Sequence, residues 1–162
     1  MSQAFRLLIV DDNQGFVDRM AGMLLPLQHV TVQSAGSYAE AIGKLVKEEP
    51  DMVLLDISLP DRNGISLLKK IKELGHESEV VMISNSSSQF YRDKCRQLGA
   101  RAFLDKTGEF ERVPQLIAES GLRPARKLAV NQTKPYYEEN LGEDKIGYQT
   151  NGRSPRPLPF CN

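Results

Sequence analysis

Short apolar runs alternate with helical patterns along residues 5–121, and this alternation sets the fold class. We expect strands at residues 5–10, 30–32, 52–55, 80–83 and 102–104. After each strand, apolar residues recur every three or four positions, which predicts an amphipathic helix. Short connections between alternating strands and helices favour right-handed crossovers, and therefore a parallel sheet with helices on both faces. The sequence thus predicts a doubly wound α/β fold of five strand–helix units, (βα)5, in three layers.

Several residues sharpen the predicted helix boundaries. Ser37 followed by Glu40 is a capping-box pattern and predicts the start of the second helix. Gly75 fits the position just after the third helix, where glycine tolerates a left-handed backbone. Pro114 lies within the last helical pattern, and a residue without an N–H fits best in a first turn. We therefore expect the fifth helix to begin later than Phe110 suggests.

The composition is that of an ordinary globular domain. The chain has 162 residues, of which 40% are apolar and 26% charged, which suits one domain. No apolar run approaches the ~18 residues that a membrane span needs, and no signal-like leader opens the chain. Cys95 and Cys161 lie far apart and have no zinc-like spacing with histidine. We therefore expect a cytoplasmic protein without membrane contact, and neither a disulfide nor a zinc site is implied.

Charge and proline content divide the sequence after Leu122. Residues 1–122 hold 14 basic and 17 acidic residues, a net charge of −3, so no overall basic surface is expected for nucleic acid. Residues 123–162 hold 7 basic and 4 acidic residues and five prolines, with few apolar residues. We therefore predict a domain over 1–122 and a mostly disordered C-terminal tail over 123–162, with no DNA-binding output domain.

Five polar side chains lie where predicted strands end. Asp11 and Asp12 follow the first strand, Asp56 the third, Ser84 the fourth and Lys106 the fifth. In an open parallel sheet, ligands bind at the carboxyl ends of the strands, where the strand order reverses. In the flavodoxin-like order 2-1-3-4-5, that point lies between strands one and three, which the acidic residues follow. Three carboxylates, a hydroxyl and an ammonium at one edge predict a divalent-metal and phosphoryl site.

The acidic residues suit that chemistry. Mg²⁺ takes one or two protein carboxylates, retains several waters and is completed by phosphate oxygens. A carboxylate nucleophile such as Asp56 needs an exposed oxygen and a metal that neutralises the phosphoryl oxygens. The main-chain carbonyl of Ser58 is a further candidate metal ligand. Simpler roles stay open for each residue alone: helix-dipole stabilisation for Asp11 and Asp12, a solvated strand end for Asp56, and helix capping for Ser84. For Ser86, Ser87 and Ser88, helix capping is the role that we expect.

Over residues 5–121, the sequence resembles the receiver (CheY-like) domain of two-component response regulators. The family's first strand and acidic pair are similar to residues 8–13, LIVDDN. Its phosphoacceptor strand and loop are similar to residues 54–64, LLDISLPDRNG, almost residue for residue. Its fifth strand is similar to residues 99–106, GARAFLDK. The resemblance implies a phosphoryl-accepting signalling domain.

The resemblance also assigns roles to individual residues. It implies that Asp56 accepts a phosphoryl group from a phosphohistidine, that Asp11, Asp12 and Asp56 hold Mg²⁺, and that Lys106 binds the phosphate. Neither of the two histidines of the chain lies in a donor-like setting, so the donor is another molecule. The implied partner is a sensor histidine kinase or a histidine phosphotransfer protein.

The implied output is a change of shape. Ser84 would be the switch hydroxyl and Phe103 the switch aromatic. Phosphorylation adds a charge of about −1.5 to −2 and strong acceptors, which would draw Ser84 inward and let Phe103 fill the vacated space. The face formed by the fourth helix, fifth strand and fifth helix would then bind a downstream target protein differently. Receiver-like domains can also pair as homodimers through this face.

A few positions depart from the commoner family pattern. Ser84 stands where threonine is frequent, and the hydroxyl is retained. Asn85 stands where a very small residue is usual, so its amide either crowds the phosphate or donates another hydrogen bond. Phe103 lacks a phenol and therefore offers no switch hydroxyl. Ser58 and Ser86 occupy positions that tune self-dephosphorylation in the family.

We expect a switch and not an enzyme, and two alternatives stay open. An aspartyl phosphatase of the haloacid dehalogenase type needs an Asp-x-Asp pattern after strand one, which residues 11–13 lack, and no cap domain is visible. A binding scaffold that never takes phosphate would be favoured by an incomplete set of site residues, whereas this set is complete. Nucleotide binding is disfavoured, because no glycine-rich phosphate loop follows a strand.

Overall fold

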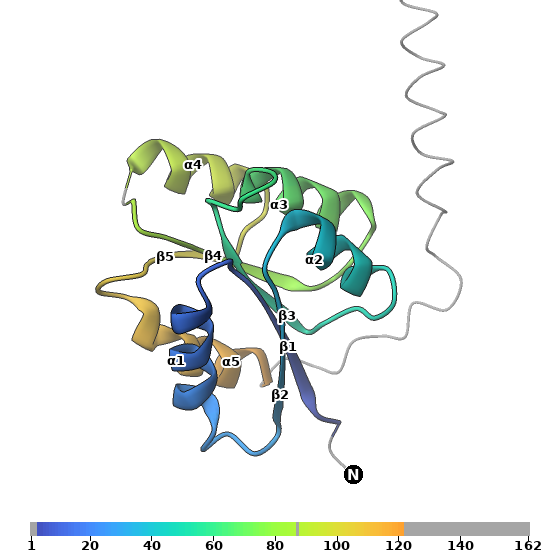
Figure 1. Cartoon of the computed structure of the whole chain (residues 1–162), viewed down its shortest axis with the longest axis vertical. Coiled ribbons are helices and arrows are strands. Elements are labelled where there is room, and N and C mark those ends of the chain that lie inside the picture. The colour runs from blue at the N-terminus through green and yellow to red at the C-terminus, as the bar shows by residue number, and fades with distance from the viewer. Residues whose placement is uncertain (1–2, 87, 122–162) are drawn as a thin grey trace, which may run out of the picture. The chain divides into compact units, whose positions relative to one another are not determined.

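The computed structural model describes residues 3–86 and 88–121, and in them five strands form one parallel sheet. Its order is β2-β1-β3-β4-β5, which confirms the predicted fold class and strand order (Figure 1). The strands are β1 (Phe5–Val10), β2 (Val30–Ala35), β3 (Met52–Asp56), β4 (Glu79–Ser84) and β5 (Ala102–Asp105). The order reverses between β1 and β3, so the edge of the sheet at their carboxyl ends is where a ligand site is expected.

Helices cover both faces of the sheet, which gives the predicted three layers (Figure 1). The helices are α1 (Gln14–Leu24), α2 (Tyr38–Leu45), α3 (Gly64–Glu73), α4 (Gln89–Gln97) and α5 (Val113–Gly121). A short 3₁₀ turn, Phe110–Arg112, precedes α5. Buried residues of α1 and α5 belong to one hydrophobic cluster, and those of α2, α3 and α4 belong to another. The sheet therefore separates two cores.

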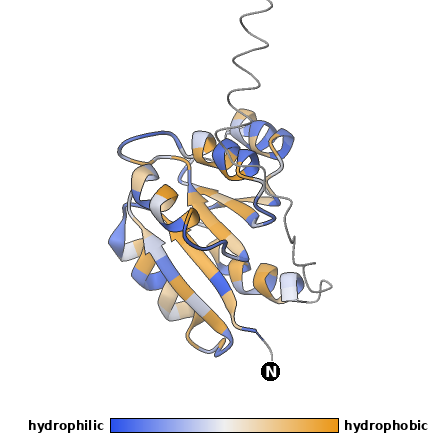
Figure 2. Cartoon of the chain, turned by 90° about the vertical axis from the view of Figure 1, so that its right-hand side faces the viewer, coloured by the Kyte–Doolittle hydropathy of each residue, from blue (hydrophilic) through white to orange (hydrophobic). Residues whose placement is uncertain are grey.

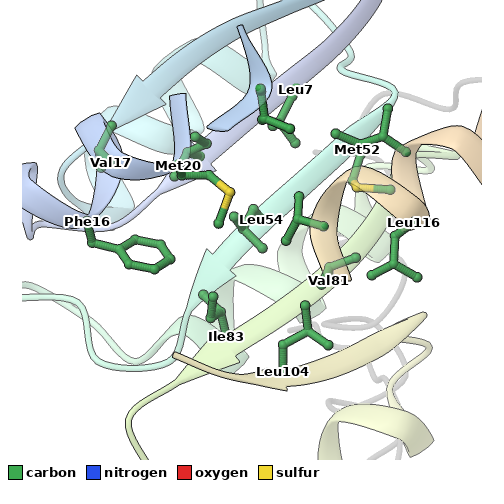
Figure 3. Close-up of a cluster of buried hydrophobic side chains, with 14 residues drawn as sticks. Leu7, Phe16, Val17, Met20, Met52, Leu54, Val81, Ile83, Leu104 and Leu116 are labelled. Atoms are coloured by element: carbon green, nitrogen blue, oxygen red, sulfur yellow. The ribbon is translucent and has the colours of Figure 1, made fainter. Parts of the chain in front are cut away.

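Side chains of the central strands alternate between these two cores. On β3, Met52 and Leu54 pack with α1 and α5 (Figure 3). Val53 and Leu55 pack against α2, α3 and α4. All five β3 residues are buried. The interior strands β1, β3 and β4 are accordingly mostly hydrophobic, whereas hydrophilic residues are frequent on the helices and in the loops (Figure 2). This confirms the expectation that a continuously apolar run forms a strand covered on both sides.

The edge strand β2 is longer than its apolar run predicted. It extends to Ala35, whereas the sequence indicated residues 30–32. Thr31 and Gln33 are exposed on this edge strand, so the chain alternates polar and apolar residues there. That pattern gives a weaker signal than the buried runs of the interior strands.

The helix boundaries follow the predicted signals with one difference. The Ser37 side chain accepts a hydrogen bond from the Glu40 N–H, as a helix cap does. The Glu40 carboxylate, however, accepts from the N–H of Gly36, one residue earlier than in a capping box. Gly75 follows α3 with a φ of 74°, and Pro114 lies in the first turn of α5, which begins after the 3₁₀ turn. These two boundaries confirm the predictions.

The predicted tail over 123–162 lies outside the described residues, and the proposed domain boundary at residue 122 stays a prediction. Within the described part of the chain, every helix is too short or too polar to cross a bilayer.

Candidate functional site

The register of the central strands brings the predicted acidic residues together. Val10 of β1 pairs with Leu55 of β3, and Asp11 and Asp56 follow these two residues at the same edge of the sheet. Asp11, Asp12 and Asp56 each offer a carboxylate oxygen, and these oxygens lie within 4.8 Å of one another. Asp11 and Asp56 are buried and Asp12 is exposed. The predicted clustering of the three carboxylates is therefore present.

Lys106 extends from the end of β5 into this cluster. Its ammonium Nζ lies 2.5 Å from Asp11 Oδ2 and 3.2 Å from Asp56 Oδ2. It also lies 4.8 Å from the centroid of the Phe16 ring, so an aromatic face covers one side of the charge. We call Asp11, Asp12, Asp56 and Lys106 the carboxylate site. One ammonium opposes three carboxylates, which leaves this site short of positive charge.

The electrostatics at Asp56 follow from burial. Removal from water and the neighbouring Asp11 carboxylate raise the pKa of Asp56, and the Lys106 ammonium opposes that shift only in part. The Ser58 N–H donates to Asp56 Oδ1 at 3.2 Å and helps to stabilise the ionised form. The Lys106 ammonium and the Ser58 N–H therefore do not fully offset the effects of burial and of Asp11 on the pKa of Asp56. A bound cation would lower that pKa.

The orientation of Asp11 fits a metal ion. Its Oδ1 accepts the Asn13 N–H at 2.9 Å, whereas its buried Oδ2 accepts no hydrogen bond within the described residues. The contact of that oxygen with Lys106 is an ion pair without hydrogen-bond geometry. Asn13, and not the acidic pair, caps α1 by accepting from the Phe16 N–H. Three carboxylates whose oxygens lie within 4.8 Å of one another are a donor set that Mg²⁺ prefers.

The serines of the site differ in their contacts. Ser84 is buried at the end of β4, opposite Asp105 of β5, and its hydroxyl accepts the Ser86 N–H at 3.0 Å. Ser88 occupies the position before α4 but makes no capping hydrogen bond there. Ser58 lies in the loop after β3, and its main-chain carbonyl as a metal ligand stays a prediction. The expected capping role is therefore wrong for Ser88, and residue 87 lies outside the described residues.

An arginine of α4 contacts Phe103, and the sequence did not predict this contact. The Arg92 guanidinium lies 4.9 Å from the centroid of the Phe103 ring and donates to the Phe103 carbonyl at 3.0 Å. It also donates to Glu109 at 3.1 Å, and Glu109 accepts the Asp105 N–H. These bonds lower the pKa of Glu109. The predicted switch aromatic is thus tied to both α4 and the segment around Lys106.

A polar hollow opens beside the carboxylate site. Its volume is about 500 Å³, and Asn85 and Lys106 line it together with Arg19 and the two rings of Phe16 and Phe110. The Arg19 guanidinium lies 4.4 Å from the Phe110 ring centroid. Asn85 is exposed at this opening, which leaves both of its predicted effects open.

A family model for the response regulator receiver domain matches residues 7–118 of the chain. The chain is a member of the response regulator receiver family. The chemotaxis protein CheY of Bacillus subtilis is 32% identical over 114 residues, which cover 70% of this chain and 95% of that protein. Mg²⁺ and phosphoaspartate are typical of receiver domains, and receiver domains interact with kinases or phosphotransfer proteins and with target proteins. The predicted resemblance is confirmed.

Larger regulators and solved structures match the same receiver domain. The transcriptional regulatory protein DltR of Streptococcus agalactiae is 29% identical over 118 residues, and this chain spans about half (51%) of its length. A CheY-like receiver domain from Methanospirillum hungatei superposes with a TM-score of 0.65 and 26% identity, covering 74% of this chain and 98% of that one. The CheX–CheY–BeF₃–Mg²⁺ complex from Borrelia burgdorferi contains a chain that superposes with a TM-score of 0.67 and 27% identity. The match covers 75% of this chain and 92% of that one.

Two contacts near the site were not apparent from the sequence. Arg92 reaches Phe103 from another element, and Asp61 of the loop after β3 accepts N–H groups at the start of α2. The structure also shows why only glycine fits at position 64: a Cβ there would lie 2.0 Å from the Asp56 carbonyl oxygen. The asparagine-glycine pair at 63–64 is the one sequence signal that hinted at a constrained loop.

Proposed function

We propose that Asp56 is the phosphoacceptor of this receiver domain and takes its phosphoryl group from a phosphohistidine of a partner protein. The observation that carries this proposal is the Lys106 ammonium between the Asp11 and Asp56 carboxylates, with a third carboxylate within 4.8 Å. This arrangement concentrates negative charge around one carboxylate at the sheet edge. It therefore favours binding of a cation together with an incoming phosphate.

The phosphoryl transfer is a displacement at phosphorus. An Asp56 carboxylate oxygen forms the new P–O bond, the P–N bond of the phosphohistidine breaks, and its electron pair returns to the imidazole nitrogen. Lys106 is already within 3.2 Å of Asp56, so its ammonium is placed to bind a phosphoryl oxygen once the carboxylate is modified. Ser84 lies at the neighbouring strand end, where its hydroxyl can donate to another oxygen of the same group.

Asp11, Asp12 and Asp56 are the residues that would hold Mg²⁺, with the Ser58 main-chain carbonyl as a fourth ligand. When bound, the ion neutralises charge on the phosphoryl oxygens as they approach the carboxylates. The buried Asp11 Oδ2, which accepts no hydrogen bond in the described residues, supports this assignment. A related structure, the CheX–CheY–BeF₃–Mg²⁺ complex from Borrelia burgdorferi, supports this assignment by analogy.

Phosphorylation would act on the α4–β5–α5 face. A new dianion at Asp56 recruits Ser84 and the β4–α4 loop, which weakens the present hydrogen bond between Ser84 and Ser86. Phe103 then has room to move toward the site, and its contact with Arg92 changes. A downstream protein, or a second copy of the chain, would read this face. We infer a protein-contact output in the cytoplasm without direct nucleic-acid or membrane binding.

Acetyl phosphate provides the test. The unaltered chain should gain one phosphoryl mass at Asp56 when incubated with acetyl phosphate and Mg²⁺, and mass mapping should find none without metal. Asp56→Asn should take no label, and Lys106→Ala should fold yet show weakened Ser84 and Phe103 responses by NMR. A label on another residue, or no label on the unaltered chain under any metal condition, contradicts the proposal.

The same experiment addresses the two alternatives. A haloacid dehalogenase-like phosphatase would turn over a phosphomonoester and place the covalent group on Asp11, so Asp11→Asn and Asp56→Asn separate the two mechanisms. A scaffold would bind its partner equally well with Asp56→Asn and would take no label. We infer that the chain is not a turnover enzyme, because its Asp56 is held in a binding cluster and residues 11–13 lack the phosphatase pattern.

A further inference from the structure

The loop after β3, residues 57–63, is shaped by contacts within itself. Ser58 and Asn63 pair in an isolated antiparallel bridge, and the Asn63 side chain accepts the Ile65 N–H at 2.7 Å and caps α3. Gly64 lets this loop run close against the Asp56 carbonyl. These contacts fix the shape of the loop, but they connect it only to its immediate neighbours in sequence.

Asp61 connects the same loop to α2. Its carboxylate accepts the Tyr38 N–H at 2.8 Å and the Ala39 N–H at 3.0 Å, both in the first turn of α2. First-turn N–H groups have no partner inside the helix, so a carboxylate there satisfies two donors and meets the positive end of the helix dipole. Arg62 adds a second contact, because its guanidinium lies 4.6 Å from the Tyr38 ring centroid. We call these four residues, Tyr38, Ala39, Asp61 and Arg62, the loop clamp.

A backbone hydrogen bond connects the segment before α2 to the carboxylate site. The last residue of β2, Ala35, accepts the Asp11 N–H at 3.0 Å, and α2 begins three residues later. The loop clamp therefore links the loop that carries Ser58 to the strand end that supports Asp11. Asp61 thus connects the segments that follow two different strands and that carry the prospective metal ligands Asp11 and Ser58.

We propose that Asp61 is a positioning residue for Mg²⁺ binding, because it fixes the 57–63 loop relative to Asp11. This inference rests on the proposed function of Asp56 as a metal-assisted phosphoacceptor. Asp11 and Asp56 repel one another, so without the clamp the loop and the strand end would separate until a cation restores their spacing. Residues that orient metal ligands typically change metal affinity by about 10- to 100-fold when they are replaced. Asp61 is exposed, so the low end of that range is expected.

Mg²⁺ titration of the full chain tests this proposal. Backbone-amide NMR shifts give the Mg²⁺ dissociation constant for the unaltered chain, Asp61→Ala and Asp61→Asn. Asp61→Ala should raise it roughly 10-fold. Asp61→Asn also removes the charge but keeps an oxygen that accepts from a first-turn N–H, so it should stay within about threefold of the unaltered chain. With acetyl phosphate, Asp61→Ala should raise the half-saturating Mg²⁺ concentration and leave the rate at saturating Mg²⁺ unchanged.

Each contrary outcome has a separate meaning. If Asp61→Ala binds Mg²⁺ as tightly as the unaltered chain, the positioning role alone is overturned. If Asp61→Ala and Asp61→Asn lose the same Mg²⁺ affinity, the effect is one of charge, and the positioning role is again overturned. A lower maximal rate with an unchanged half-saturating Mg²⁺ concentration also overturns it. If the unaltered chain neither binds Mg²⁺ nor takes a label at Asp56, the proposed function fails and this inference fails with it. Amide exchange at Tyr38 and Ala39 reports whether the variants have opened the clamp.

Discussion

The two ends of the sheet each carry a cluster of charged side chains, and the clusters differ in how many hydrogen bonds the central cation donates. At the carboxyl end, the Lys106 ammonium faces three carboxylates and donates one hydrogen bond within the described residues, to Asp56. At the amino end, Arg101 precedes β5 and bonds to Glu79, Glu119, Ser120 and the Leu116 carbonyl. We call Arg101 with Glu79, Glu119 and Ser120 the amino-end cluster.

The amino-end cluster joins three elements by directed hydrogen bonds. Arg101 donates to Glu119 at 2.8 Å and to Leu116 at 3.1 Å, both on α5, and to Glu79 of β4 at 3.1 Å. Ser120 donates in turn to Glu79. A planar guanidinium with five N–H donors can satisfy several acceptors at once, which an ammonium between two carboxylates does not do. We therefore expect the amino-end cluster to contribute more to stability than the carboxylate site, for which we propose a role in ligand binding.

Removal of Arg101 should give the largest loss of stability. Arg101→Ala leaves the partly buried Glu79 without its guanidinium partner, and we expect the free energy of unfolding to fall by about 3 kcal/mol. Phosphorylation at Asp56 should be unchanged below the unfolding transition. Urea unfolding measures the first effect and acetyl phosphate labelling the second. Arg96→Ala is the matched control: Arg96 is largely exposed on α4 and should lose less than about 0.5 kcal/mol. Equal losses in both variants would break the comparison.

The carboxyl end depends on close backbone fit more than on charge pairing. A Cβ on Gly64 would lie 2.0 Å from the Asp56 carbonyl oxygen, and that oxygen belongs to the backbone, so it cannot rotate away. We expect Gly64→Ala to lower the free energy of unfolding by about 2 kcal/mol and to slow labelling of Asp56. Gly22→Ala in α1, where nothing lies within 4 Å of the added Cβ, should instead stabilise by about 0.5–1 kcal/mol. Full labelling of Gly64→Ala would show that the site tolerates a displaced loop.

This contrast also separates what the sequence predicted from what it did not. The carboxylate site was predictable, because parallel strands bring their carboxyl ends to one edge and each site residue directly follows an apolar run. The amino-end cluster was not, because Arg101 precedes β5 and Glu79 begins β4 in a sequence rich in charged residues. Their pairing depends on the register of β4 and β5, and the remaining partners come from α5, so no local pattern encodes the cluster. The loop clamp is long-range for the same reason: Asp61 and Tyr38 are 23 positions apart.

The predicted ends of secondary-structure elements were wrong where the local sequence signal was weak or where another hydrogen bond formed instead. The apolar run of β2 indicated residues 30–32, but pairing with β1 extends the strand to Ala35, since ladder hydrogen bonds need no apolar side chain. Ser88 has the residue type of a helix cap, yet its side chain makes no capping bond. Nearby, the Ser86 N–H bonds to the Ser84 hydroxyl. Side-chain type indicates what a residue can bond to, and tertiary packing decides which bond forms.

The smallest expected effect concerns the charge imbalance at the carboxyl end. Because burial and Asp11 raise the pKa of Asp56 above its ordinary value of 3.8, the folded state holds this proton more tightly than the unfolded chain. The contribution of Asp56 to stability is therefore greatest below pH 3.8 and declines as the pH rises through the folded-state pKa. At neutral pH without Mg²⁺, Asp56→Asn should stabilise the protein by about 1 kcal/mol, although it loses one contact with Lys106.

Urea unfolding of the unaltered chain and Asp56→Asn, from pH 4 to pH 8 in a chelator, measures this difference. The stability advantage of Asp56→Asn should widen as the pH rises, and Mg²⁺ at about ten times its dissociation constant should reduce it by stabilising the unaltered chain by roughly 1.4 kcal/mol. Asp51→Asn is the control, because Asp51 lies just before β3 and accepts the Arg6 N–H. This substitution should destabilise the protein. If Asp56→Asn were less stable than the unaltered chain at every pH, the Lys106 contact would outweigh the repulsion. The carboxyl end would then resemble the amino end, with its charges arranged for stability.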